Sequence, residues 1–173
     1  MLNPSAIHIF VYGTLKPGYA AYDRLCAGRT IAEVPTIVPG SLYHLPLGYP
    51  AITLETHLDI QLDQLQTPDQ SRQVDPSQPN VTGVKHWVQG YCLSFRDPQI
   101  LETLDDYEHH DWDDLLQVCP HHPHGNDYSR IQKTVYTPSG QVFGPAWVYA
   151  MTLDQIDRLQ GKFVSSGVWQ GGS

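Results

Sequence analysis

An apolar run, Ile7-His8-Ile9-Phe10-Val11, leads directly into Tyr12-Gly13-Thr14-Leu15 and then into Lys16-Pro17-Gly18. Such a run with one polar interruption predicts a buried strand. Gly13, just past the end of the run, predicts a turn with a positive φ. A turn of this kind can aim consecutive backbone amides into a cavity, where they would hold a carboxylate or a phosphate. An ordinary Gly-Thr loop is the alternative interpretation.

Length and composition favour one compact domain spanning residues 1–173. A chain of 173 residues is long enough for one well-buried core and short for two. Its 14 glycines, 14 prolines and 10 tyrosines are typical of a turn-rich fold with many strands, and they argue against a helical bundle. The net charge of −8, without any basic stripe, argues against a nucleic-acid partner.

The chain shows no sign of a membrane segment or a disulfide framework. The apolar run from Ala6 to Val11 is too short for a signal-peptide core or a membrane span, so we expect a cytoplasmic protein without membrane contact. The three cysteines, Cys26, Cys92 and Cys119, are odd in number and lack C-x-x-C spacing. Free and mostly buried thiols are the expected state.

Several elements are indicated in the first half of the chain. A short helix is predicted over residues 22–27, ended by Gly28, and an extended segment over residues 31–43, bent at Pro39-Gly40. Leu58, Ile60 and Leu62 alternate with polar residues, as in a half-buried strand. Residues 67–83 are almost purely polar, which predicts a mobile surface loop.

The second half alternates strands with helices. One side of a strand over residues 87–95 is mostly apolar and is expected to face the core, namely Trp87, Gln89, Tyr91, Leu93 and Phe95. A helix over residues 98–107 should start after Asp97, whose carboxylate can accept from the first-turn amides. A hairpin is predicted around Pro138-Ser139-Gly140, and Thr152 with Gln155 resembles the capping box of a last helix ending near Gly161. This order argues for an α+β fold.

Glu108 stands at the end of the helix predicted over residues 98–107. Exposed carbonyls give a helix C-terminus a partial negative charge, and Asp105 and Asp106 lie within one turn. These like charges should raise at least one carboxyl pKa. An acidic helix end without a compensating base breaks a local rule, as functional sites often do. A solvated acidic helix end is the alternative.

Together, these segments resemble the gamma-glutamylcyclotransferase-like family, closest to its gamma-glutamylamine cyclotransferase branch. The resemblance rests on matching segments in one order along the chain, namely Tyr12-Gly13-Thr14-Leu15-Lys16, Gly40-Ser41-Leu42-Tyr43, Gly48-Tyr49-Pro50-Ala51, Gln89-Gly90-Tyr91, Leu104-Asp105-Asp106-Tyr107-Glu108, Tyr128-Ser129-Arg130 and Ser166-Gly167-Val168-Trp169. It implies a small, mixed, partly closed β-barrel flanked by short helices. We expect inserted surface segments at about 56–86 and 109–126.

The resemblance also implies a reaction. The α-amine of a γ-glutamyl compound attacks its own γ-carbonyl, releasing 5-oxoproline and a free amine, with Glu108 as the catalytic acid and base and no cofactor or metal. Holding the amine against the carbonyl removes much of the entropic barrier. Tyr12, Gly13, Thr14 and Leu15 would hold the α-carboxylate. Tyr128 would line the pocket, although a core tyrosine tied by one hydrogen bond is an equal alternative.

Two features depart from the family pattern. His109 replaces the glycine that usually follows the glutamate, and the insertion at 109–126 is rich in histidine. Its His121-His122-Pro123-His124 lacks the spacing that presets a metal site, so no specific metal is expected. Arg130 is typical of a strand arginine that covers acidic surface such as Asp105. A non-catalytic ligand-binding domain and a small-amide hydrolase remain the alternative functions.

Overall fold

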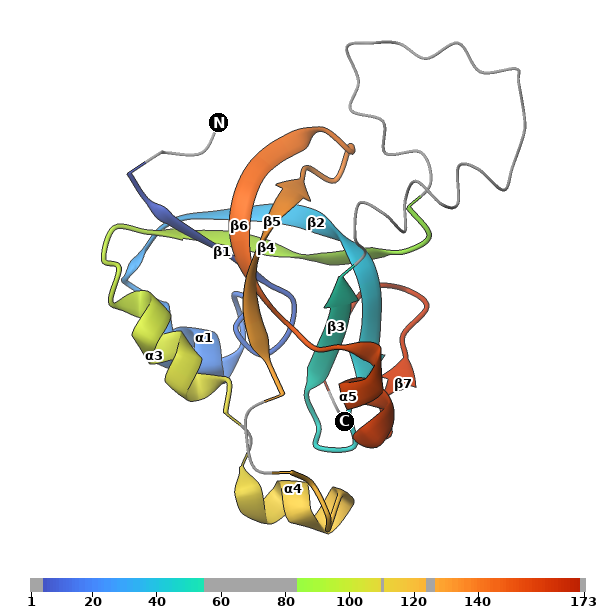
Figure 1. Cartoon of the computed structure of the whole chain (residues 1–173). Coiled ribbons are helices and arrows are strands. Elements are labelled where there is room, and N and C mark those ends of the chain that lie inside the picture. The colour runs from blue at the N-terminus through green and yellow to red at the C-terminus, as the bar shows by residue number, and fades with distance from the viewer. Residues whose placement is uncertain (1–4, 55–83, 110, 124–126, 172–173) are drawn as a thin grey trace, which may run out of the picture.

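The computed structural model describes residues 5–54, 84–109, 111–123 and 127–171, and Figure 1 shows its architecture. In chain order, the helices and strands are β1 (Ile7–Val11), α1 (Ala20–Leu25), β2 (Thr30–His44), β3 (Pro50–Leu54), β4 (Trp87–Phe95), α3 (Ile100–Tyr107), α4 (Trp112–Val118), β5 (Ser129–Tyr136), β6 (Val142–Ala150), α5 (Leu153–Arg158) and β7 (Lys162–Phe163).

Five of the strands close into a mixed barrel. β1 pairs antiparallel with β4, β4 with β2, and β5 with β6, while β1 and β6 are parallel neighbours. The ring closes where Ile37 of β2 pairs with Tyr136 of β5. β2 continues beyond the barrel and pairs there with β3 and β7. The expected α+β fold, a mixed β-barrel flanked by short helices, is confirmed.

The apolar sequence of β1 follows from burial on both faces. Phe10 belongs to the core inside the barrel, together with Val88 and Val148. Ile9 and Val11 face the other way, into a second core under α1 and α3. A strand buried on two faces needs a nearly continuous apolar run rather than strict alternation. β1 therefore carries the loop that follows it on a rigid, central support.

The expected core face of β4 is wrong for the first half of the strand. Val88 and Cys92, which have the opposite parity, are buried inside the barrel, whereas Gln89 is exposed. Leu93 and Phe95 do pack on a core, the second one beneath α3. The strand changes from one-sided to two-sided burial along its length, so its alternation alone could not identify the inner face.

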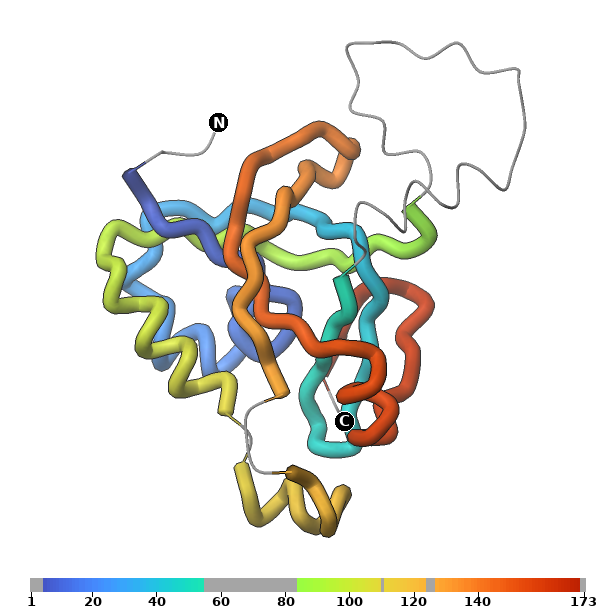
Figure 2. Tube along the Cα trace, viewed as in Figure 1, coloured from blue at the N-terminus to red at the C-terminus, as the bar shows by residue number. Residues whose placement is uncertain are grey.

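A third core lies at the end of the molecule where α4 and α5 sit. Leu115 of α4 is fully buried there with Leu45 and Ile156. Figure 2 shows the chain descending along α3 and returning upward as β5, with α4 at the lower end between them. The segment after Glu108 is thus partly integrated into the core.

Most element predictions match the structure within two residues. The first helix starts and ends two residues earlier than expected, with Gly28 at φ 75° after it. Asp97 Oδ1 accepts from the amide of Gln99 at 2.9 Å, just ahead of α3. The β5–β6 hairpin and the Thr152–Gln155 capping box of α5 are confirmed. The strand through Leu58 and the loop at 67–83 lie outside the described residues.

Other sequence expectations concern thiols, membranes and domain limits. Within the described chain, all three cysteines are free, with Cys26 and Cys92 buried and Cys119 half-buried. No helix in the described ranges is long and apolar enough to cross a bilayer. The single domain with insertions at about 56–86 and 109–126 stays a prediction.

Candidate functional site

A cavity of about 250 Å³ lies between the loop after β1, the end of α3 and the starts of β3 and β5. This volume is near the lower limit of ligand pockets, roughly 300–1,000 Å³. Its lining comprises Phe10, Val11, Tyr12, Gly13, Thr14, Leu15, Tyr49, Pro50, Tyr107, Glu108, His109, Asp111, Tyr128 and Tyr149. All six residues proposed from the sequence therefore surround one cavity.

Gly13 is required for a different reason than expected. Its φ is not positive, so the predicted left-handed turn is wrong at this residue; Gly18 has the positive φ, at 92°. A Cβ on Gly13 would lie 2.6 Å from Cγ of Pro50, a distance at which neighbouring atoms must move. The glycine lets the loop after β1 approach the start of β3 closely, and this contact forms one wall of the cavity.

The loop after β1 presents polar groups to the cavity. The carbonyl of Gly13 accepts from the amide of Lys16 at 3.1 Å, which forms a tight turn. Within the described residues, the amides of Gly13, Thr14 and Leu15 have no hydrogen-bond acceptor. Thr14 Oγ1 lies 2.9 Å from the hydroxyl of Tyr107, which ties the loop to the end of α3. The loop can therefore offer amides to an anionic group.

Glu108 is the C-cap of α3 and faces the same cavity. Its amide donates to the carbonyl of Leu104 at 2.9 Å, so the backbone completes the last helical turn. Burial raises the pKa of its carboxyl group to about 8, and the negative charge of Asp105 contributes further. Sequence reasoning gave the right direction but credited like charges, whereas burial is the larger cause. Such a carboxyl group can accept or donate a proton near neutral pH.

Asp105 takes part in a network behind the cavity wall. Its Oδ1 accepts from the hydroxyl of Tyr149 at 2.6 Å, and its Oδ2 lies 3.1 Å from the guanidinium of Arg130. The acidic helix end therefore does have a compensating base, supplied by β5, which corrects the expectation from the sequence. Arg130 covers Asp105 as expected, and its side chain also lies over the ring of Trp147.

The tyrosines of the wall hold their hydroxyl protons on fixed acceptors. Tyr12 donates to the carbonyl of Tyr149 at 2.8 Å, and Tyr128 donates to that of Pro50 at 2.7 Å. Burial and the nearby Glu108 raise the pKa of Tyr12 well above the usual tyrosine value. Burial, with contributions from Tyr12 and Glu108, does the same for Tyr128. These phenols stay neutral at physiological pH, which leaves Glu108 better suited to proton transfer.

Three lining tyrosines were not proposed from the sequence. Tyr49, Tyr107 and Tyr149 come from distant segments and meet only in the folded chain. Tyr107 precedes Glu108 directly, so its proximity could have been inferred. Tyr128 combines both roles considered for it, since it lines the cavity and is tied by a hydrogen bond to Pro50.

The described histidines of the segment after Glu108 make separate contacts. His109 lines the cavity, with its Nδ1 3.2 Å from the carbonyl oxygen of Asp106. His122 is buried and its Nε2 lies 2.6 Å from Oδ2 of Asp127. Among the described residues, no three His, Cys, Asp or Glu side chains are grouped so that they could hold a metal ion. His110 and His124 lie outside the described residues.

Comparisons with known proteins agree with this geometry. The chain matches the family "Gamma-glutamyl cyclotransferase, AIG2-like" over residues 9–64 and 70–171. A search of curated proteins finds no match.

Solved structures share the fold. An AIG2-like protein from Mus musculus is 20% identical, with a TM-score of 0.54 over 95% of this chain and 88% of that one. A protein from Arabidopsis thaliana, solved in solution, is 20% identical, with a TM-score of 0.51 over 96% of this chain and 74% of that one. YkqA from Bacillus subtilis is 16% identical, with a TM-score of 0.53 over 95% of this chain, which spans 39% of the YkqA chain.

Proposed function

The chain belongs to the gamma-glutamyl cyclotransferase, AIG2-like family, and on this basis we propose that it cyclises a γ-glutamyl compound. A bond forms between the α-nitrogen and the γ-carbon, and the bond from that carbon to the leaving nitrogen breaks. The products are 5-oxoproline and a free amine. Family membership supports a cyclotransferase-type activity and a small-molecule substrate, and we propose a γ-glutamylamine as that substrate.

The observation that carries this proposal is the position of Glu108 across one small cavity from the loop after β1. In the proposed complex, amides of Gly13, Thr14 and Leu15 bind the α-carboxylate, and Tyr12 forms the wall behind it. This anchoring brings the α-amine toward the γ-carbonyl, which favours an intramolecular reaction. The loop supplies orientation, and Glu108 supplies proton transfer.

Glu108 moves one proton in two steps. Its carboxylate first takes a proton from the α-ammonium group, which frees the amine for attack. The resulting carboxylic acid then protonates the departing nitrogen. The second proton that the α-nitrogen loses as the lactam forms passes to the released amine, which leaves as an ammonium ion. A pKa of about 8 suits both steps because about a tenth of Glu108 is ionised at pH 7 and can act as the base, while its conjugate acid is a ready proton donor. The reaction returns Glu108 to its starting state and needs no outside co-reactant.

The tyrosines contribute enclosure rather than proton transfer. Tyr12, Tyr128 and Tyr149 donate their hydroxyl protons to fixed acceptors, at 2.8, 2.7 and 2.6 Å. Their rings line the cavity that would hold the reaction centre. In the proposed complex, the tethered amine is favoured over water because it is already held beside the carbonyl.

The test is product formation from several γ-glutamyl amides. We expect equal amounts of 5-oxoproline and free amine with the unaltered protein. Glu108→Gln should lower kcat by about 10²–10⁴-fold while substrate binding, measured by calorimetry, is retained. Binding without turnover by the unaltered protein would instead support a non-catalytic ligand-binding domain. A Gln variant with more than about a tenth of the original rate would remove Glu108 from the mechanism.

A further inference from the structure

The cavity lining has two chemically different parts. One part is formed by the loop after β1, whose amides suit the α-carboxylate of a glutamyl group. The other part comes from the segment after α3, which adds His109 and Asp111, and from Tyr49, whose pKa is raised by burial and further by nearby charges that include Asp111. Among the described residues, the lining contains no lysine or arginine. This second part is therefore acidic and aromatic, and we expect the leaving group to lie against it.

Three basic side chains lie close to the cavity wall but are engaged elsewhere. Lys16 follows the amide loop, yet its ammonium group donates to the carbonyl of Trp169 at 2.5 Å. Arg24 lies over the ring of Tyr107, 5.7 Å from its centroid, and does not line the cavity. Arg130 is paired with Asp105. None of the three lines the cavity.

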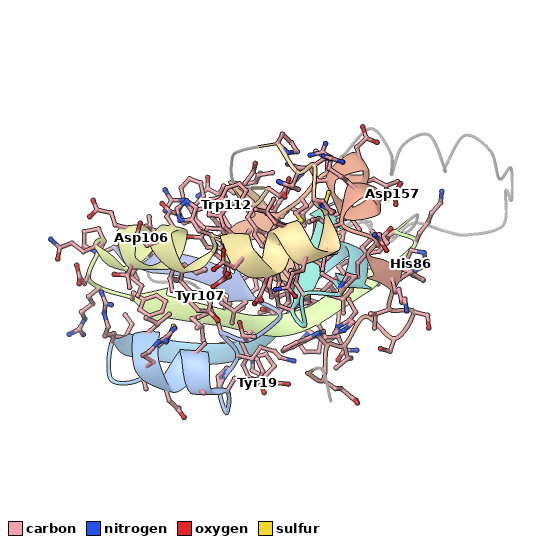
Figure 3. All side chains as sticks on the ribbon, turned by 90° about the horizontal axis from the view of Figure 1, so that it is seen from below. Tyr19, His86, Asp106, Tyr107, Trp112 and Asp157 are labelled. Atoms are coloured by element: carbon pink, nitrogen blue, oxygen red, sulfur yellow. The ribbon has the colours of Figure 1, made fainter. Side chains whose placement is uncertain are left out.

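Asp111 is held in place by its helix cap. Its Oδ1 accepts from the amides of Asp113 and Asp114 at 3.0 and 3.3 Å, at the start of α4. Asp111 is also exposed and lines the cavity, so its charge faces solvent at the mouth. Figure 3 shows α4 next to the end of α3, with Tyr107 and Trp112 labelled near the junction. The position of this charge is thus set by the fold.

We propose that the amine released by this enzyme carries a second positive charge and no carboxylate, and that Asp111 selects it. This inference rests on the proposed cyclisation. A terminal ammonium group is attracted by Asp111 and by the ring of Tyr49. A terminal carboxylate is repelled and meets no lysine or arginine in the described lining. The overall charge of −8 acts in the same direction.

Three substrates of matched length provide the test. The γ-glutamyl amides of 1,4-diaminobutane, pentylamine and 5-aminopentanoate share a four-carbon spacer and end in ammonium, methyl and carboxylate. At low ionic strength, kcat/KM for 5-oxoproline release should fall in that order. Each step should be about two- to fivefold, the range of an exposed charge pair, mainly through KM. Added salt should reduce the differences.

Two variants assign the preference to one residue. Asp111→Asn removes the charge but keeps a good N-cap, and it should erase most of the preference for ammonium over methyl. Asp113→Asn changes the same helical turn outside the lining and should keep that preference. Equal rates on all three amides, or faster release from the carboxylate compound, would overturn this inference alone. No 5-oxoproline from any of them, the uncharged amide included, would overturn the proposed cyclisation as well.

Discussion

Replacing Asp105 with asparagine should shift the pH dependence of catalysis without abolishing it. Asp105 raises the pKa of Glu108, and the guanidinium of Arg130, 3.1 Å away, partly offsets its charge. The Asn side chain keeps an oxygen that can accept from the hydroxyl of Tyr149. The substitution therefore removes a charge while preserving the hydrogen bond that orients Tyr149.

The size of the shift follows from the ranking of causes. Glu108 has a pKa of about 8, and burial accounts for more of the rise than Asp105 does. Removing one partly paired charge should move the rising limb of kcat/KM to lower pH by about one unit. At pH 7 the ionised fraction of Glu108 would then rise from about a tenth to about half. We expect up to about a fivefold gain in kcat/KM at that pH, reduced by the weaker base.

The assay is 5-oxoproline release between pH 5.5 and 9.5, measured for the parent, Asp105→Asn and Asp106→Asn. Sequence reasoning treated the two aspartates alike. In the structure Asp106 is exposed and is not among the causes of the raised pKa of Glu108, so its variant serves as the control. The electrostatic coupling between Asp105 and Glu108 would be refuted if the rising limb of kcat/KM stayed in place in Asp105→Asn, or if it shifted equally in Asp105→Asn and Asp106→Asn.

Four further predictions follow from the same contacts. Glu108→Gln should stabilise the fold above pH 7 by about 1–3 kcal/mol and have little effect near pH 4. The reason is that the raised pKa of Glu108 makes the parent lose stability as pH rises from about 4.5 to 8. Melting temperatures of the parent and the variant that change identically with pH would contradict this. Gly13→Ala should lower the free energy of unfolding by about 1–3 kcal/mol and impair substrate binding, since its Cβ would lie 2.6 Å from Pro50. Gly18→Ala is the control because a Cβ there meets open space and strains only its own backbone. Equal effects of the two substitutions on KM would argue against substrate binding by the loop after β1. Leu115→Ala should lower the free energy of unfolding, measured in urea, by about 2–5 kcal/mol because that side chain is fully buried. An unchanged free energy of unfolding would show that α4 does not contribute to the core. Chelators should leave activity unchanged, and activity lost to a chelator and restored by a single ion would revive the histidine segment as a metal site.

The sequence predicted those strands, turns and caps that are determined by residues close together in the chain. The apolar run of β1, the hairpin around Gly140 and the capping box of Thr152 depend on neighbouring residues, and each is present. The prediction of the inner face of β4 was wrong because the burial of each face is decided by the elements that cover the sheet. Val88 faces the barrel core, and Leu93, on the opposite face, packs in the core under α3; alternation within β4 separates these two faces but does not tell which of them is covered.

In the candidate site, too, the sequence predicted what depends on local residues and missed what depends on tertiary packing. Glu108 and the loop after β1 could be proposed from sequence because each carries a local anomaly or motif. The burial that raises the pKa of Glu108, and the contact of Gly13 with Pro50, arise from tertiary packing. Arg130 was correctly expected to cover Asp105, but the binding of Tyr149 to the same carboxylate required the fold.

The most direct test of the proposed cyclisation is an isotope experiment in water enriched in ¹⁸O. The purified protein is given a γ-glutamylamine that it turns over, and the products are identified by mass spectrometry. Attack by the substrate's own amine predicts 5-oxoproline without ¹⁸O from the solvent, and this product should disappear with Glu108→Gln. Glutamate carrying one solvent-derived ¹⁸O as the first product would show hydrolysis and contradict the account.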